Sequence, residues 1–235
     1  MTFFGATVCS WATLLLVRTK LFIFDFDGTV ADTFAVAVEI FNELSAEFSY
    51  RPIREEELNE TRTMSAKQIL KRHGIKMKHL PKLAAKALRM LRERIEAVQP
   101  YDGVPEMLRE LGARGHQLGI LTSNSEENVR VFLEMHDLDV FDFVKSCPRL
   151  FGKARELKKI MKNRGLKPEE VLFVGDEVRD IEAGQKVNVT VAAVGWGFTL
   201  EETLRAERPD LFVRAPMELV ALSGQSEDPG SVDRE

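Results

Sequence analysis

The sequence predicts an α/β protein with a Rossmann-like parallel sheet core, helices on both faces of that sheet, and an inserted small α-helical cap domain. Three observations support this fold. Short apolar runs alternate along the chain with amphipathic helical patterns, as in parallel sheets whose strands are buried on both faces. The segment 33–99 interrupts the alternation because it contains only helical patterns. Polar side chains follow several apolar runs, where open parallel sheets bind ligands.

The core elements follow from the spacing of apolar residues. The predicted strands are the continuous apolar runs Leu21–Phe24, Gln117–Leu121, Val171–Val174 and Val189–Val194. Apolar residues at helical spacing predict the helices Val104–Arg114, Glu126–His136, Lys153–Asn163 and Val178–Lys186. Because strands and helices alternate, we expect βαβ units and parallel strands.

The cap is expected over residues 33–99, after the first strand. Its predicted helices are Phe34–Phe48, Ser65–His73 and Leu80–Val98, each with Lys, Arg and Glu between the apolar positions. The catalytic core is therefore expected to consist of residues 21–32 and 100–222.

Both chain ends are expected to lie outside the folded domains. Residues 1–20 form an N-terminal extension, and its apolar stretch Phe3–Val17 is shorter than the roughly 20 residues of a membrane span. Basic residues follow this stretch, whereas they precede the apolar part of a secretory signal. We interpret it as a poorly packed extension or a start codon assigned too far upstream, with a membrane anchor or targeting segment as the alternative. Residues 223–235 are predicted to be a disordered tail.

Composition limits the class of partner and the compartment. The formal net charge of −4 and the pI near 5.7 argue against nucleic acid as the main partner, because binding a phosphate backbone requires a basic surface. Cys9 and Cys147 have no metal-ligand or redox spacing, which favours free thiols in a reducing, cytoplasmic environment. No pattern indicates an oligomeric state.

Groups that suit phosphoryl transfer follow the predicted strands. They are Asp25 and Asp27 after the first strand, Thr122, Ser123 and Asn124 after the second, Asp176 and Asp180 after the third, and Lys153 at the start of the helix before that strand. Clustered carboxylates repel one another, and Mg²⁺ with its preference for oxygen ligands removes that repulsion. A lysine, a hydroxyl and the amides of a loop that opens a helix can bind phosphate oxygens.

Each of these residues also has a structural interpretation. Asp25 and Asp27 are compatible with ordinary turn carboxylates, and Lys153 and Asp180 with solvent-facing positions on helices; the convergence of several motifs favours function. Arg62 lies in a predicted cap loop, where its guanidinium could bind a carboxylate or a second phosphate of a substrate. A surface arginine is the alternative for Arg62.

The ordered motifs resemble the haloacid dehalogenase superfamily. They are Asp25-Phe26-Asp27-Gly28-Thr29, Thr122, Lys153, and Gly175-Asp176 followed by Asp180. Gly195-Trp196-Gly197-Phe198 and Pro209-Asp210 resemble the C-terminal part of the members that are similar to phosphoglycolate phosphatase, and the predicted helical insertion resembles the mobile cap of that subfamily. The resemblance extends from Leu21 to about Leu222.

The resemblance implies a role for each motif residue. Asp25 would be the nucleophile that forms an aspartyl-phosphate, and Asp27 would protonate the leaving oxygen and then activate water. The resemblance also implies that Mg²⁺ would be held by Asp25, the Asp27 carbonyl, Asp176 and Asp180, with Asp180 binding directly or through water. Thr122 and Lys153 would bind the phosphoryl group. An aspartate at position 27 favours phosphate over halide chemistry within the superfamily.

We therefore expect a Mg²⁺-dependent phosphatase that hydrolyses a small phosphate monoester such as phosphoglycolate. A sugar phosphomutase or phosphotransferase, and a non-catalytic binding protein on the same fold, are the alternatives. Two departures from the resemblance are Glu177, where many relatives have a small residue, and the absence of a Lys-Pro pair at Lys153. Whether Glu177 joins the metal ligands is left open.

Overall fold

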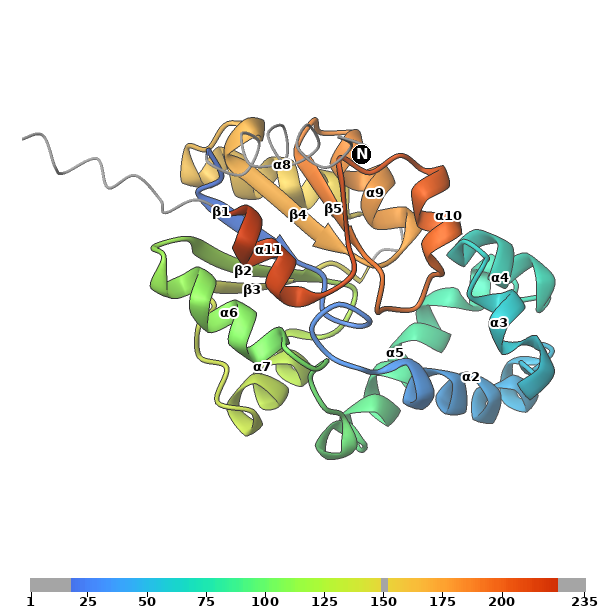
Figure 1. Ribbon diagram of the computed structural model, residues 1–235. Helices are drawn as coiled ribbons and strands as arrows, with labels where there is room; N and C mark the ends of the chain where they lie inside the picture. Colours follow the sequence, from blue (N-terminus) through green and yellow to red (C-terminus); the bar gives the residue numbers. More distant parts are fainter. Residues whose placement is uncertain (1–17, 149–151, 224–235) are drawn as a thin grey trace, which may run out of the picture.

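The computed structural model describes residues 18–148 and 152–223. Figure 1 shows a sheet with helices on both faces and a separate group of helices beside one end of the strands. Most of the predicted extension and tail, and with them Cys9, lie outside the described residues. No helix in the described ranges combines the length and apolar character needed to cross a membrane.

The sheet is entirely parallel, as predicted, and has the strand order β3-β2-β1-β4-β5-β6. Its strands are β1 (Leu21–Phe24), β2 (Gln117–Thr122), β3 (Phe143–Ser146), β4 (Val171–Gly175), β5 (Thr190–Val194) and β6 (Leu211–Val213). The chain moves outward from β1 in one direction and then returns to β4 on its other side. Open α/β sheets bind ligands at such a switch point, beyond the carboxyl ends of the strands.

The central strand β1 packs against helices on both faces because its side chains alternate. Phe22 and Phe24 belong to the core cluster on one face, and Leu21 and Ile23 to the cluster on the other. Helices α6 (Val104–Ala113), α7 (Glu126–Met135) and α11 (Pro216–Leu222) cover the first face, and α8 (Lys153–Arg164) and α9 (Val178–Gln185) cover the second.

The regular secondary structure of the predicted cap segment is entirely helical. It contains α2 (Phe34–Phe48), α3 (Leu58–Thr61), α4 (Ala66–Arg72) and α5 (Leu80–Arg92), with short 3₁₀ turns between them. The prediction of a single helix over Leu80–Val98 was too long, because α5 ends at Arg92 and a separate 3₁₀ turn spans Ile95–Ala97.

The chain enters and leaves the cap segment through two connecting segments that lie side by side. The Asp32 amide donates a hydrogen bond to the Gln99 carbonyl at 2.9 Å, and the Tyr101 amide donates to the Val30 carbonyl at 3.2 Å. An isolated antiparallel bridge joins Ala31 and Pro100 in the same place. The two connections are therefore paired directly after the loop that follows β1.

Apart from the short helix α3 in the cap segment, the elements that the sequence did not predict lie at the sheet edges and near the C-terminus. Strand β3 is only partly buried and contains Lys145, so its apolar run is short. Strand β6 is shorter still, and α10 (Glu201–Ala206) is a short helix beside α9. Edge strands receive weaker sequence signals because solvent covers part of their surface.

Candidate active site

Asp25 is the first residue after β1, and its side chain is 1% exposed. Its backbone amide donates to the Val174 carbonyl at 2.8 Å, which continues the pairing of β1 with β4. Oδ1 accepts a hydrogen bond from the Phe26 amide at 2.7 Å. Oδ2 lies 2.6 Å from Lys153 Nζ as an ion pair, yet no donor in the described residues meets it with hydrogen-bond geometry. The structure thus fixes one carboxylate oxygen and leaves the other without a directional partner.

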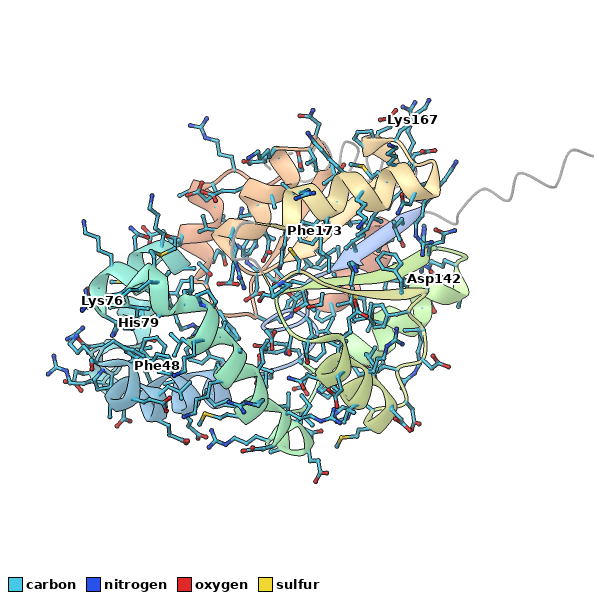
Figure 2. All side chains as sticks on the ribbon, turned by 180° about the vertical axis from the view of Figure 1, so that it is seen from behind. Phe48, Lys76, His79, Asp142, Lys167 and Phe173 are labelled. Atoms are coloured by element: carbon cyan, nitrogen blue, oxygen red, sulfur yellow. The ribbon has the colours of Figure 1, made fainter. Side chains whose placement is uncertain are left out.

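Lys153 is buried at the start of α8, which excludes the solvent-facing interpretation. Its ammonium lies 2.6 Å from both Asp25 Oδ2 and Asp180 Oδ1, and 5.6 Å from the ring centroid of Phe173, which Figure 2 labels. Burial lowers the pKa of Lys153, but the negative charges of Asp180 and Asp25 outweigh this effect and raise the pKa overall. Lys153 therefore remains a fixed positive charge between two carboxylates.

Asp180 is fully buried in the first turn of α9. Its Oδ2 accepts a hydrogen bond from the Glu177 amide at 3.2 Å, which is the capping arrangement that begins the helix. Burial raises the pKa of Asp180 to about 7, against the opposing charge of Lys153. Helix capping and the lysine together place this carboxylate in the site.

Asp25, Glu177 and Asp180 form an acidic cluster in which one oxygen of each lies within 4.8 Å of the others. All ligand atoms are carboxylate oxygens, which hard cations such as Mg²⁺ prefer. The buried Asp25 Oδ2 has the Lys153 ammonium as its ion-pair partner and meets no other donor in the described residues, which leaves lone-pair capacity for a cation. The residues present therefore suit a divalent metal, and Glu177, whose role the sequence left open, is one of them.

Asp176 follows β4 but does not belong to this cluster. Its Oδ1 accepts from the Thr29 hydroxyl and its Oδ2 from the Phe198 amide, both at 2.8 Å. A Cβ atom on Gly28 or Gly197 would collide with the Asp176 side chain, so only glycine fits at these two positions. Burial raises the pKa of Asp176 well above its usual value. In this structure Asp176 joins the loops that follow β1 and β5.

Asp27 is partly buried and is held by two side chains. Oδ1 accepts from the Thr33 hydroxyl at 3.0 Å, and Asn124 Nδ2 lies 3.1 and 3.2 Å from the two carboxylate oxygens. Burial, helped by the charge of Asp25, raises the pKa of Asp27 to about 6, although the bonds from Thr33 and Asn124 oppose the rise. A carboxyl group with this pKa can both donate and accept a proton near neutral pH.

The loop after β2 brings three predicted phosphate-binding residues to the same edge. Thr122 is buried, and its hydroxyl oxygen accepts from the Asn124 amide at 2.9 Å. The Asn124 amide is thus engaged within the loop, while its side chain positions Asp27. The Ser123 hydroxyl oxygen accepts from Arg179 Nη2 at 3.4 Å.

Arg179 is a site residue that the sequence analysis missed. It lies in the first turn of α9, and its Nε donates to Glu177 Oε2 at 2.6 Å. No motif marks it, because a single arginine near the start of a helix is common. The sequence does place Arg179 between the acidic residues Glu177 and Asp180, shortly after a predicted strand, and this position could have marked it.

Arg62 extends from the cap segment to the loop after β5. Its Nε donates to the Phe198 carbonyl at 3.0 Å and its Nη2 to the Gly197 carbonyl at 2.9 Å, while its guanidinium lies 5.3 Å from the Phe34 ring centroid. The Leu200 amide donates to the Arg62 carbonyl at 3.0 Å. In this structure these donors bind core backbone and are not directed at a ligand.

Comparisons with known proteins agree with the motifs. The family model described as haloacid dehalogenase-like hydrolase matches residues 22–194. A phosphoglycolate phosphatase from Synechococcus elongatus is 35% identical over 199 residues, which cover 84% of this chain and 94% of the relative. Pyrophosphatase PpaX from Bacillus cereus is 33% identical over 137 residues, 54% of this chain and 61% of the relative.

A solved structure supports the fold independently. A haloacid dehalogenase-like family hydrolase from Streptococcus pneumoniae matches with a TM-score of 0.72 at 18% identity, covering 87% of this chain and 98% of that one. The family model spans most of the chain, and the cyanobacterial relative is matched along nearly its whole length. The resemblance inferred from the motifs is confirmed, and the chain belongs to the haloacid dehalogenase-like hydrolase family.

Proposed function

We propose that this hydrolase is a Mg²⁺-dependent phosphatase that cleaves a small phosphate monoester through an aspartyl-phosphate at Asp25. The observation that carries the proposal is the state of the Asp25 carboxylate. One oxygen is fixed by the Phe26 amide, and the other forms an ion pair with the Lys153 ammonium at 2.6 Å. A positioned carboxylate next to a fixed cation suits nucleophilic attack on an anionic phosphoryl group.

The first half of the reaction uses Asp25 and Asp27 in different protonation states. An Asp25 oxygen attacks phosphorus and forms the acyl-phosphate bond, while the bond from phosphorus to the ester oxygen breaks. The Asp27 carboxyl group donates its proton to the departing oxygen, and its pKa of about 6 keeps a fraction protonated at neutral pH. Thr33 and Asn124 hold Asp27 in place for this transfer.

The second half returns the enzyme to its starting state. The Asp27 carboxylate removes a proton from water, and the resulting hydroxide attacks phosphorus of the aspartyl-phosphate. The acyl-phosphate bond breaks, which releases inorganic phosphate and the free Asp25 carboxylate. Thr122, Ser123 and Lys153 provide the hydroxyl groups and positive charge proposed to bind the phosphoryl oxygens.

Asp25, Glu177 and Asp180, which each have one oxygen within 4.8 Å of the others, would hold the Mg²⁺ ion. The Asp27 carbonyl and Asp176 are the further ligands that the family resemblance implies. When bound, the ion neutralises the negative charge that accumulates between the substrate and Asp25.

The first substrate to test is 2-phosphoglycolate. The cyanobacterial relative, which this chain matches over most of its length, is named a phosphoglycolate phosphatase. The relative from Bacillus cereus is named a pyrophosphatase, so pyrophosphate belongs in the same panel. Sugar phosphates test the mutase alternative, because a mutase would pass labelled phosphate to a second hydroxyl group and not to water.

The decisive experiment is phosphate release from this panel with Mg²⁺ or with EDTA, for the wild-type protein and Asp25→Asn. We expect Mg²⁺-dependent release from at least one ester, and a loss of about 10⁴-fold or more in Asp25→Asn. Asp139→Asn is the matched control because Asp139 is exposed on the surface. Turnover by Asp25→Asn at the wild-type rate, or an absence of release from every ester, would reject the proposed function.

A further inference from the structure

Arg179 is a second cation in the site, and none of the roles above uses it. Its side chain is 15% exposed and forms an ion pair with Glu177 through Nε and Nη2. Nη2 also reaches the Ser123 hydroxyl oxygen at 3.4 Å. The guanidinium therefore spans the space between the acidic cluster and the loop after β2, which carries the proposed phosphate-binding residues.

The charge of Arg179 interacts with the groups assigned to the chemistry. The guanidinium of an arginine stays protonated in proteins, so Arg179 carries a permanent positive charge. Its ion pair with Glu177 places this charge beside the acidic cluster that also contains Asp25 and Asp180.

Lys153 shares its positive charge between two carboxylates. Its ammonium already lies between the carboxylates of Asp25 and Asp180. A phosphate monoester brings further negative charge to the same place, and its phosphoryl oxygens need donors in the transition state. Arg179 has such donors, because its Nη1 forms no hydrogen bond with any residue in the described ranges.

We propose that Arg179 binds the phosphoryl group of the substrate. Its Nη1 atom, together with the Nη2 hydrogen that faces Ser123 in this structure, donates to the phosphoryl oxygens, while Glu177 holds the guanidinium through Nε and Nη2. A planar guanidinium can donate two hydrogen bonds to one phosphate, which a lysine ammonium cannot do in the same geometry. This inference rests on the proposed function and extends it, since it assigns Arg179 to substrate binding.

A purely structural role makes a different set of predictions. If Arg179 only positions Glu177, its removal changes the Mg²⁺ dependence and leaves phosphate binding intact. If Arg179 binds the phosphoryl group, its removal weakens phosphate binding and lowers kcat, while the Mg²⁺ concentration for half-maximal activity stays close to the wild-type value.

The test compares Arg179→Gln and Arg179→Lys with the wild-type protein, and uses Arg155→Gln on exposed surface as the matched control. Binding of inorganic phosphate is measured by calorimetry in the presence of Mg²⁺, alongside kcat, KM and Mg²⁺ titrations. Thermal unfolding verifies that each variant is folded. We expect Arg179→Gln to weaken phosphate binding about 10- to 100-fold and Arg179→Lys to restore part of the loss, with Arg155→Gln unchanged.

The phosphate titration separates this inference from the proposed function. A wild-type protein that hydrolyses no ester yet binds phosphate through Arg179 would reject the function and support the inference. Unchanged phosphate affinity in Arg179→Gln, with or without an altered Mg²⁺ titration, would overturn the inference while leaving the function intact. An absence of phosphate binding by the wild-type protein would overturn it as well.

Discussion

The ion pairs of Lys153 in the core and the ion pair of Arg94 in the cap segment differ in their burial. In the core, Lys153 and its partners Asp25 and Asp180 are at most 4% exposed. In the cap segment, Arg94 and Glu43 pair at 2.8 Å with side chains that are 30% and 49% exposed. Removing one member of a buried pair costs about 3–5 kcal/mol, whereas an exposed pair contributes about 0–1 kcal/mol. The charges around Lys153 are therefore constrained by stability, whereas the exposed Arg94–Glu43 pair is under little such constraint.

The largest effect is expected for Lys153→Met. This change leaves two buried carboxylates without their shared cation, so we expect the free energy of unfolding at pH 7 to fall by about 3–5 kcal/mol and phosphatase activity to be lost. Urea unfolding of the variant in EDTA measures the first effect. Lys159→Met on the exposed side of the same helix is the control. Equal stability of the two variants would show that Asp25 and Asp180 do not need the charge of Lys153 to remain buried.

A smaller effect is expected for Gly197→Ala. The new Cβ would collide with Asp176 and with the Gly28 carbonyl, so the loops after β1 and β5 must move apart. Overpacking of this kind costs about 1–3 kcal/mol, and we expect activity to fall with it. Gly112→Ala is the control, because its Cβ would meet Leu118 only at 4.0 Å and would stabilise the helix α6 by about 1 kcal/mol. Thermal unfolding that ranks the two variants in the opposite order would contradict this account.

Asp27→Asn should change how the stability of the protein depends on pH. In the folded protein the pKa of Asp27 is raised from 3.8 to about 6, so between these values the folded state holds a proton that the unfolded state has lost. Wild-type stability therefore falls as pH rises through this window. Without metal, Asp27→Asn should be more stable than the wild type by about 3 kcal/mol at pH 7, and this advantage should disappear below pH 4. Urea titrations in EDTA at pH 7 and below pH 4 measure this difference in stability. A difference that is the same at both pH values would contradict the raised pKa of Asp27.

The fold and the candidate site could be predicted where they depend on local sequence patterns or on a general property of parallel sheets. The bounds of β1 and α2 follow from a few consecutive residues, and both match the predicted ranges. The convergence of Asp25 and Lys153 on one edge follows from the rule for parallel strands. These features are encoded in local patterns combined with a general property of the fold.

Contacts that depend on the precise path of loops could not be predicted. The bond between the Phe198 amide and Asp176 joins loops that follow different strands, and it sets Asp176 apart from the acidic cluster. The same holds for Arg179, whose neighbour Ser123 is distant in sequence, and for Arg62, whose partners lie in the core. A linear pattern records which residues are charged, but not which loop faces them.

The smallest effect is expected for Arg62→Ala, which removes two hydrogen bonds between the cap segment and the core. Both bonds act at the contact between the cap segment and the core, so we expect their loss to appear mainly as faster amide exchange in α3 and the loop at Gly197, with little change in global stability. Glu43→Gln, which disrupts an exposed pair within the cap segment, is the control. Exchange rates at Gly197 that stay at the wild-type value would show that Arg62 does not join the two regions.

The paired backbone at the entrance and exit of the helical segment makes this protein an attractive scaffold for engineering. The Asp32 amide and the Gln99 carbonyl are hydrogen-bonded at 2.9 Å, so the two attachment points of everything between them are direct neighbours. A foreign insert whose own ends lie equally close could be spliced in there without changing the strand that precedes Asp25, because such adjacent junctions tolerate inserted domains. Libraries of transplanted inserts would then vary which molecules reach one unchanged candidate active site.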